Sequence, residues 1–336
     1  MTSDSTSTVT IQPDRRQPRG GDGVGLFFVM ILLLAVMIGA IMLMVRQAQE
    51  AGERRERAAR IESLTARGAI PVRVSSAEPE LLAPDAPAWH TIPAVAVRVG
   101  PQNMAMPMLD QPTIDQLLVQ TLATPTRIAL RLSWDDQTPD MSVDAGRFSD
   151  AVAVQLPLAP DPVITMGTPQ GPVQILLWKA IWQKDIDERF QDVQDLHPNY
   201  WADQYWFAKP ATDRSEESKD YRVPDSFQDP AAQAYFPARQ AGNPVAQWTR
   251  SQPVEELTAE GFGTLSTQRR SVAQGRGFWK NGRWTVTIVR PLLTDDAFDH
   301  QFHAVGQVAF AVWDGAAGNV GGRKHYSQWI PFEIVR

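Results

Sequence analysis

The feature that most constrains this chain is an apolar run near its N-terminus. Val24 to Val45 is a stretch of 22 residues without a charged side chain. A helix of about 20 apolar residues can cross the hydrocarbon core of a bilayer, so residues 24–45 are predicted to form a transmembrane anchor. A cleaved signal peptide is the alternative, but its apolar region would be shorter and would be followed by a small-residue cleavage site. The segment that follows, Arg46 to Ala51, is a poor cleavage site.

The segments that flank this run lack the apolar content of a folded core. Residues 1–23 are rich in Ser, Thr, Asp and Arg, which predicts a disordered tail. Residues 46–68 are mostly good helix formers with opposite charges at i,i+4 spacing, which predicts a solvated helical stalk. Prolines recur through residues 69–91 and predict a Pro-rich linker that leads into a folded domain at residues 92–336.

The orientation of the anchor is not determined by its flanking charges. More arginines follow the apolar run closely than precede it, and this count favours a cytoplasmic location for the C-terminal side. Large domains can be translocated despite such a bias. The charge count is therefore a weak objection to a translocated domain.

From about residue 95 onward, the sequence alternates apolar and polar residues in short runs separated by turns. Thr126–Trp134 and Trp284–Arg290 are two such runs, and no regular helix pattern lies between the runs. This pattern predicts a mainly β domain built as an antiparallel two-sheet β-sandwich. Residues 182–260 differ, because they carry many prolines, aromatic residues and charges with little period. They are predicted to form a large irregular or helical insertion.

The absence of cysteine narrows the chemistry that the chain can perform. It excludes disulfides, thiolate zinc sites, iron–sulfur clusters and the covalent attachment of a c-type haem. A metal or cofactor must therefore be held by His, Met, Lys or carboxylate groups. The sequence also lacks a nucleophile elbow, a phosphate-binding glycine loop and a zinc-protease motif. The net charge of −6, without an evident basic face, predicts no nucleic-acid partner.

Six segments of the predicted domain, taken in order, resemble a known family. The segments are Arg127–Asp140, Phe148–Pro157, Thr165–Ala180, Glu260–Leu265, Gly282–Leu292 and Phe310–Trp329. The residues in these segments and their order along the chain resemble those of the haem-binding domain of the ethylbenzene dehydrogenase γ-subunit family. This domain is also described as the cytochrome c-552/DMSO reductase-like haem-binding domain. The resemblance covers roughly residues 92–336. Relatives in that family are partners of molybdenum enzymes of the dimethylsulfoxide reductase type.

The resemblance implies a β-sandwich that holds one non-covalent b-type haem, with a methionine and a lysine as axial ligands of the iron. The family's methionine corresponds to Met166 and its lysine to Lys324. His325 is the runner-up to Lys324, and adjacent residues on a strand point to opposite faces, so only one of the two can reach the iron. Lys179 and Arg290 are candidates for pairing with the haem propionates.

The same resemblance implies an electron-transfer subunit without catalytic residues of its own. Its expected partners are a molybdenum catalytic subunit with an iron–sulfur subunit, or a cytochrome. Together with the predicted anchor, it implies a single-pass protein of the inner (cytoplasmic) membrane with a periplasmic domain. Without the family context, Met166 would be an ordinary core methionine and Lys324 a turn lysine. A haem-free, membrane-anchored β-sandwich that binds a carbohydrate or another ligand is therefore the alternative.

Overall fold

The computed structural model describes most of the chain and divides it into two compact units. The described residues are 22–75, 80–191, 193–199, 236–243, 246–247 and 250–335. The two units are Met1–Ala58 and Ala59–Arg336. The predicted disordered tail therefore lies almost wholly outside the described residues.

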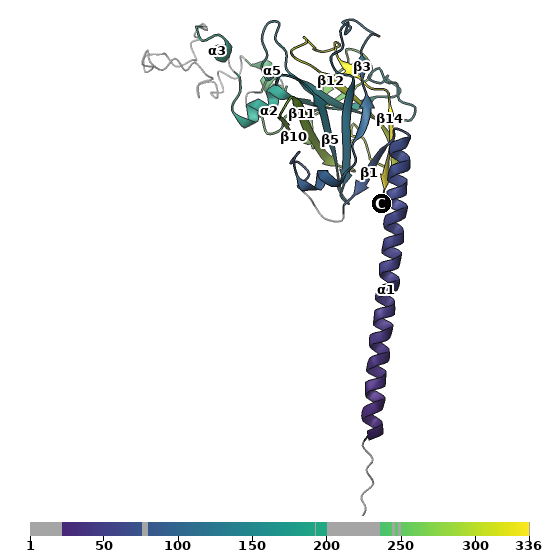
Figure 1. The fold of residues 1–336 in the computed structure, drawn as a ribbon. Helices are drawn as coiled ribbons and strands as arrows, with labels where there is room; N and C mark the ends of the chain where they lie inside the picture. The colour runs from purple at the N-terminus through teal and green to yellow at the C-terminus, as the bar shows by residue number, and fades with distance from the viewer. Residues whose placement is uncertain are drawn as a thin grey trace, which may run out of the picture. The chain divides into compact units, whose positions relative to one another are not determined.

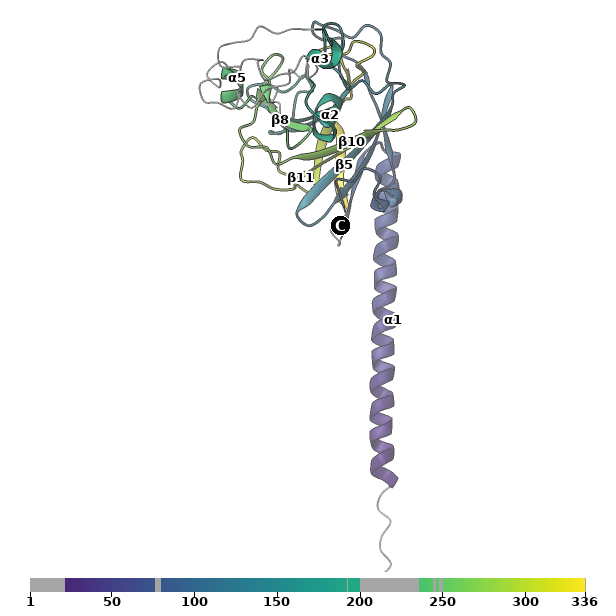
Figure 2. The same ribbon diagram turned by 90° about the vertical axis from the view of Figure 1, so that its left-hand side faces the viewer.

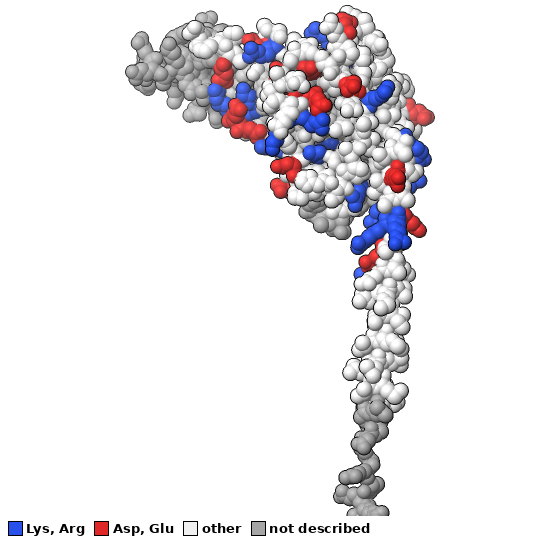
Figure 3. Space-filling view, viewed as in Figure 1, with Lys and Arg blue, Asp and Glu red and all other residues white. Residues whose placement is uncertain are grey.

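The first element is one long helix, α1, which runs from Asp22 to Ala66. From Phe27 onward it is long and apolar enough to cross a membrane, with a mean hydropathy of 3.0 over an 18-residue apolar stretch. The large apolar side chains of residues 27–45 are exposed, and Figure 3 shows no charged atoms along this apolar part of the helix. The predicted apolar helix near the N-terminus is thus confirmed. Past the apolar part, Arg46 Nε and Glu50 Oε1 form an i,i+4 ion pair at 3.0 Å.

The second unit consists mainly of β-strands, which confirms the predicted fold class (Figure 1). The strands are β1 (Ile70–Val74), β2 (Val95–Arg98), β3 (Gly100–Pro101), β4 (Gln116–Ala123), β5 (Arg127–Asp135), β6 (Ala151–Pro157), β7 (Val173–Lys179), β8 (Val254–Ala259), β9 (Ser266–Thr267), β10 (Gln274–Trp279), β11 (Arg283–Pro291), β12 (Val305–Trp313), β13 (His325–Tyr326) and β14 (Ile330–Val335). The short helices are η1 (Pro87–Thr91), α2 (Ala180–Asp187), α3 (Val193–Leu196) and α5 (Pro237–Gln240).

Hydrogen bonds join the described strands into a single 14-stranded sheet. Its order is β10-β11-β5-β4-β1-β14-β12-β6-β7-β8-β9, with β2 beside β4 and with β13 between β12 and β3. The sheet is mixed, because β1 is parallel to both β14 and β4, whereas the sequence predicted a purely antiparallel sandwich. The difference arises at residues 70–74, which the sequence assigned to the linker. They form β1, and this N-terminal strand lies beside C-terminal β14 (Figure 1).

Strands that lie far apart in this sheet order contribute side chains to one common core. β12 joins the two halves of the order, because its first residues pair with β14 and its last residues pair with β6. β10, β11 and β5 lie side by side in one half (Figure 2), and Trp134 and Trp284 from this half contact Trp178 of β7. The Trp178 and Trp284 ring centroids are 5.1 Å apart, and those of Trp134 and Trp178 are 6.4 Å apart. These indoles fill the centre of the main core.

The core is so closely filled around Trp178 that one neighbouring position must be glycine. A Cβ atom added to Gly277 of β10 would lie 2.4 Å from Cζ2 of Trp178. No side chain fits at that distance, and protein interiors leave few voids into which the indole could shift. Gly277 therefore allows the two halves of the sheet to approach each other.

The residues predicted to form the insertion contain both helices and a strand. α2, α3 and α5 lie within or at the edge of residues 182–260, and β8 pairs antiparallel with β7. Residues 200–235 lie outside the described residues. The strand was missed because Pro253 and Glu255 interrupt the apolar pattern around it.

Candidate functional site

A cavity of about 740 Å³ lies on the outer face of β12, β6, β7 and β8. Its size is typical of cavities that bind a small molecule or a cofactor. Successive residues of a strand point to opposite faces, so every second residue of these strands reaches the cavity. The strand residues that line it in this way are Ala151, Ala153 and Gln155 of β6, Ile175, Leu177 and Lys179 of β7, Leu257 of β8, and Ala309, Ala311 and Trp313 of β12; Phe310 of β12 also borders the cavity. Four of them are alanines, whose small side chains leave space on this face of the sheet.

Met166 projects into this cavity from the loop between β6 and β7. Its side chain is buried, with 8% of the residue exposed, and it packs with Ala153 and Ile175. The backbone of Met166 has a φ of 65°. This left-handed conformation is unfavourable for a residue with a Cβ atom, and such conformations concentrate at functional sites.

The surrounding backbone fixes this strained conformation. The carbonyl oxygen of Met166 accepts a hydrogen bond from the Gly261 N–H at 2.9 Å, and the Met166 N–H donates to the Ile164 carbonyl at 2.8 Å. Gly167 follows with a φ of 76°, and a Cβ atom there would lie 2.7 Å from the Gly171 carbonyl oxygen. Glycine at position 167 is therefore a local requirement of the loop that presents the Met166 thioether.

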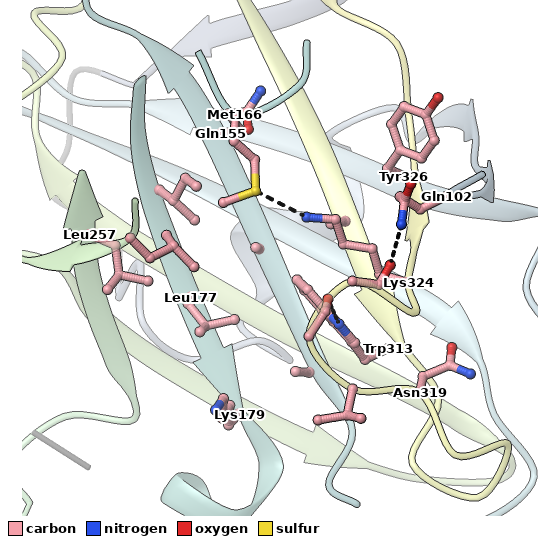
Figure 4. A pocket seen from close by; sticks show the side chains of 18 of the residues that line it. Gln102, Gln155, Met166, Leu177, Lys179, Leu257, Trp313, Asn319, Lys324 and Tyr326 are labelled. Carbon is pink, nitrogen blue, oxygen red and sulfur yellow. Dashed lines mark hydrogen bonds between the residues drawn. The ribbon is translucent and has the colours of Figure 1, made fainter. Parts of the chain in front are cut away.

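Lys324 faces Met166 across the cavity, from the loop that precedes β13. Its Nζ atom lies 3.7 Å from Sδ of Met166 (Figure 4) and 5.5 Å from the ring centroid of Trp313. Burial lowers the pKa of the Lys324 ammonium, because desolvation penalises the charged form. No carboxylate of the described residues forms an ion pair with it. The structure thus brings together the two residues that the sequence proposed as a pair.

The backbone of Lys324 is held by the loop that follows β3. The Gln102 N–H donates to the Lys324 carbonyl at 2.9 Å. The buried side-chain amide of Gln102 also donates to the Gly322 carbonyl at 2.9 Å and accepts from the N–H groups of Met104 and Ala105. The amide therefore connects the lysine loop to a second loop at the cavity rim.

His325, the runner-up, points away from the cavity and has no exposed surface. Its Nε2 atom accepts hydrogen bonds from the N–H groups of Thr113 and Ile114, at 2.9 and 3.1 Å. Its Nδ1 atom lies 3.3 Å from the Val312 carbonyl. Because Nε2 accepts two bonds, the ring is neutral, with Nδ1 as the donor, and burial lowers the pKa of this imidazole. Both nitrogens are therefore engaged with the backbone.

The two other candidate cations occupy different environments. Lys179 lines the cavity. Arg290 does not line it; the residue is fully buried on β11, where its guanidinium lies 3.5 Å from Oδ2 of Asp299 and also contacts Gln174. Arg290 thus belongs to a polar network in the interior of the fold.

Sequence reasoning missed a group of four carboxylates, Asp136, Asp140, Asp150 and Asp314. Atoms from all four lie within 4.8 Å of one another. Burial raises the pKa of Asp150 to about 8 and that of Asp136 to about 6, and the proximity of like charges adds to both shifts. In the sequence, Asp136 and Asp140 indicated only a turn. Their meeting with Asp314 depends on contacts between residues that are far apart in the chain.

A comparison with known protein families identifies the family of this chain. The model of the ethylbenzene dehydrogenase family matches residues 86–325, well over half of the chain. The chain belongs to the ethylbenzene dehydrogenase family. A curated relative from Haloferax mediterranei has the name "Putative respiratory nitrate reductase heme subunit ORF7". It is 27% identical over 276 residues, which cover 80% of this chain and 75% of the relative.

Solved structures that match this member of the ethylbenzene dehydrogenase family do so only weakly. They include a carbohydrate binding module of family 9 from Caldicellulosiruptor kristjanssonii in complex with glucose, at 5% identity and a TM-score of 0.34, covering 79% of this chain and 95% of the module. The same type of module with cellotriose gives 6% identity and a TM-score of 0.32, covering 79% and 92% of the two chains. Scores this low support no inference about fold or ligand.

Proposed function

We propose that this member of the ethylbenzene dehydrogenase family is a membrane-anchored electron-transfer subunit that carries one non-covalent b-type haem and catalyses no reaction of its own. Family membership and the name of the Haloferax relative support a haem subunit. The observation that carries the proposal is the 3.7 Å approach of Lys324 Nζ to Met166 Sδ inside the cavity. We propose these two side chains as the axial ligands of the haem iron.

The donor atoms suit this role in spacing and in chemistry. The 3.7 Å between Lys324 Nζ and Met166 Sδ places both donors where they would hold the same iron. Lysine can bind a metal only as the neutral amine, and burial favours that form of Lys324. His325 is the weaker candidate, because both of its nitrogens bind the backbone.

The ligand set favours electron transfer over catalysis at the iron. Haem, when bound, supplies reversible one-electron exchange between ferric and ferrous iron. Met166 and Lys324 would occupy both axial positions, so no position would remain for a substrate. A thioether ligand raises the potential by favouring ferrous iron. The absence of cysteine is consistent with non-covalent binding.

The proposal also includes attachment to a membrane and a place among redox partners. Helix α1 is proposed as a single-pass anchor in the inner membrane, with the haem domain on the periplasmic side. The relative's name, which refers to a respiratory nitrate reductase, supports a place in an oxidoreductase complex. The proposed partners are a molybdenum catalytic subunit with an iron–sulfur subunit, or a cytochrome, and nucleic acid is not among them.

Optical spectroscopy of the detergent-purified full-length chain tests this function. A six-coordinate, low-spin b-type spectrum is expected, and Met166→Ala and Lys324→Ala should each convert it to a different coordination state. Met44→Ala and Lys280→Ala are matched controls at exposed positions that do not line the cavity, and they should leave the spectrum unchanged. A folded protein that stays colourless in the presence of haem would contradict the proposal and favour the haem-free binding module.

A further inference from the structure

Charged side chains gather at the end of the cavity that lies away from the Met166–Lys324 pair. Lys179, Asp185 and Arg250 line this end together with Trp182. Gln155 and Ile175, near Met166, form one cross-strand pair, and Ala151 and Lys179 form another pair four residues along the strands. At about 3.3 Å per residue, this separation is roughly 13 Å. In Figure 4, Leu177 and Trp313 lie between the two ends.

Most of the charge at this end is already neutralised. Arg250 Nε lies 3.2 Å from Asp185 Oδ2, and the two side chains are only 8% and 3% exposed. The guanidinium carbon of Arg250 also lies 4.6 Å from the ring centroid of Trp182. The Asp185 carboxylate therefore neutralises the Arg250 guanidinium, which also packs against Trp182.

Lys179 is different, because its charge lacks a direct partner. Its Nζ atom lies 4.7 Å from the ring centroid of Trp182. Among the described residues, the ammonium makes no hydrogen bond and no ion pair within 4.0 Å. Glu255 acts on it only from a longer distance, and burial lowers the pKa of this ammonium. A half-buried cation that no carboxylate of the described residues neutralises is costly, and an anionic group of a ligand would reduce that cost.

We propose that Lys179 binds a carboxylate of the cofactor, which for haem is a propionate. This inference rests on the proposed function and adds an orientation to it. The cavity between its two ends is lined by apolar groups such as Leu177, Leu257 and Trp313. An amphipathic cofactor would place its apolar ring there and its carboxylate edge at Lys179. The interaction of Lys179 with the carboxylate then determines which edge of the ring faces the charged end of the cavity.

A comparison of two cofactors tests the proposal directly. The full-length chain, freed of its cofactor, is reconstituted with haem or with haem dimethyl ester, which lacks the free carboxylates, and the dissociation rate of each is measured. The unsubstituted chain is expected to hold haem about tenfold longer than the ester, the effect of one charge-assisted hydrogen bond. Lys179→Met should reduce this preference to less than about twofold, and Lys179→Arg should restore it.

The controls separate a failure of this inference from a failure of the proposed function. Lys280→Met, at an exposed position, should keep the tenfold preference. If Lys179→Met keeps it as well, while both cofactors give spectra that depend on Met166 and Lys324, the carboxylate assignment is wrong and the haem function stands. If neither cofactor gives such a spectrum, the proposed function fails and the carboxylate assignment fails with it. Thermal melting of each variant shows that it is folded before rates are compared.

Discussion

The two faces of β6 and β7 are built from the same strands but are filled differently. On the inner face, Val152, Leu176 and Trp178 are fully buried in the main core. On the outer face, Ala153 and Leu177 line a cavity of about 740 Å³. Large residues fill the inner face to the density of a protein interior, whereas small residues leave space on the outer face. One face therefore provides stability, and the other provides a binding site at little cost to stability.

The largest expected effect is on the inner face. Trp178→Ala removes the indole that contacts both Trp134 and Trp284, and should lower the free energy of unfolding by about 3–5 kcal/mol. Leu177→Ala, the neighbouring residue on the outer face, should cost much less, because its side chain already borders open space. Urea denaturation of the two variants measures the difference. Equal losses would show that the two faces do not differ in this way.

A smaller effect is expected where β6 begins, at the carboxylates around Asp150. The raised pKa values of Asp150, about 8, and Asp136, about 6, mean that the folded chain binds these protons more tightly than the unfolded chain. Their contribution to stability is therefore complete below about pH 4, the pKa of a free Asp, and is lost as the pH rises through 6 and 8.

Asp136→Asn tests this pH dependence. The substitution removes the negative charge that helps to raise the pKa of Asp150. It should stabilise the protein at pH 8.5 by about 1 kcal/mol and flatten the dependence of stability on pH between 6 and 8.5. Asp135→Asn, at the exposed neighbouring position, is the control and should preserve the dependence of stability on pH between 6 and 8.5. An unchanged slope in Asp136→Asn would contradict the coupling between the two carboxyl groups.

The smallest effect on stability is expected on the outer face. Ala153→Leu extends a side chain into the cavity and should change the free energy of unfolding by less than about 0.5 kcal/mol, while haem uptake is lost. Val152→Leu, one residue earlier on the filled face, should destabilise the protein by about 1–3 kcal/mol through overpacking. Denaturation curves and haem titrations of both variants test the contrast. Normal haem uptake by Ala153→Leu would show that the ring lies elsewhere.

Much of the architecture could be predicted from local patterns. The uncharged run at residues 24–45 predicted an apolar helix because membrane-spanning length is a property of consecutive residues. Alternation in segments such as Thr126–Trp134 predicted strands, because side chains alternate between faces. Strand β1 at Ile70–Val74 was not predicted, because its short run lies among prolines and its partners are at the other end of the chain.

The sequence by itself determined the apolar helix, the mainly β class, the exclusion of thiolate chemistry and, through family resemblance, Met166 and Lys324 as a candidate pair. Only the tertiary structure decided that these two side chains meet within 3.7 Å, that both nitrogens of His325 bind the backbone, and that Lys179 lines the cavity whereas Arg290 does not. The physical reason is that helices and strands follow from periodicities of neighbouring residues. A site depends on the faces and loops that long-range strand pairing brings together.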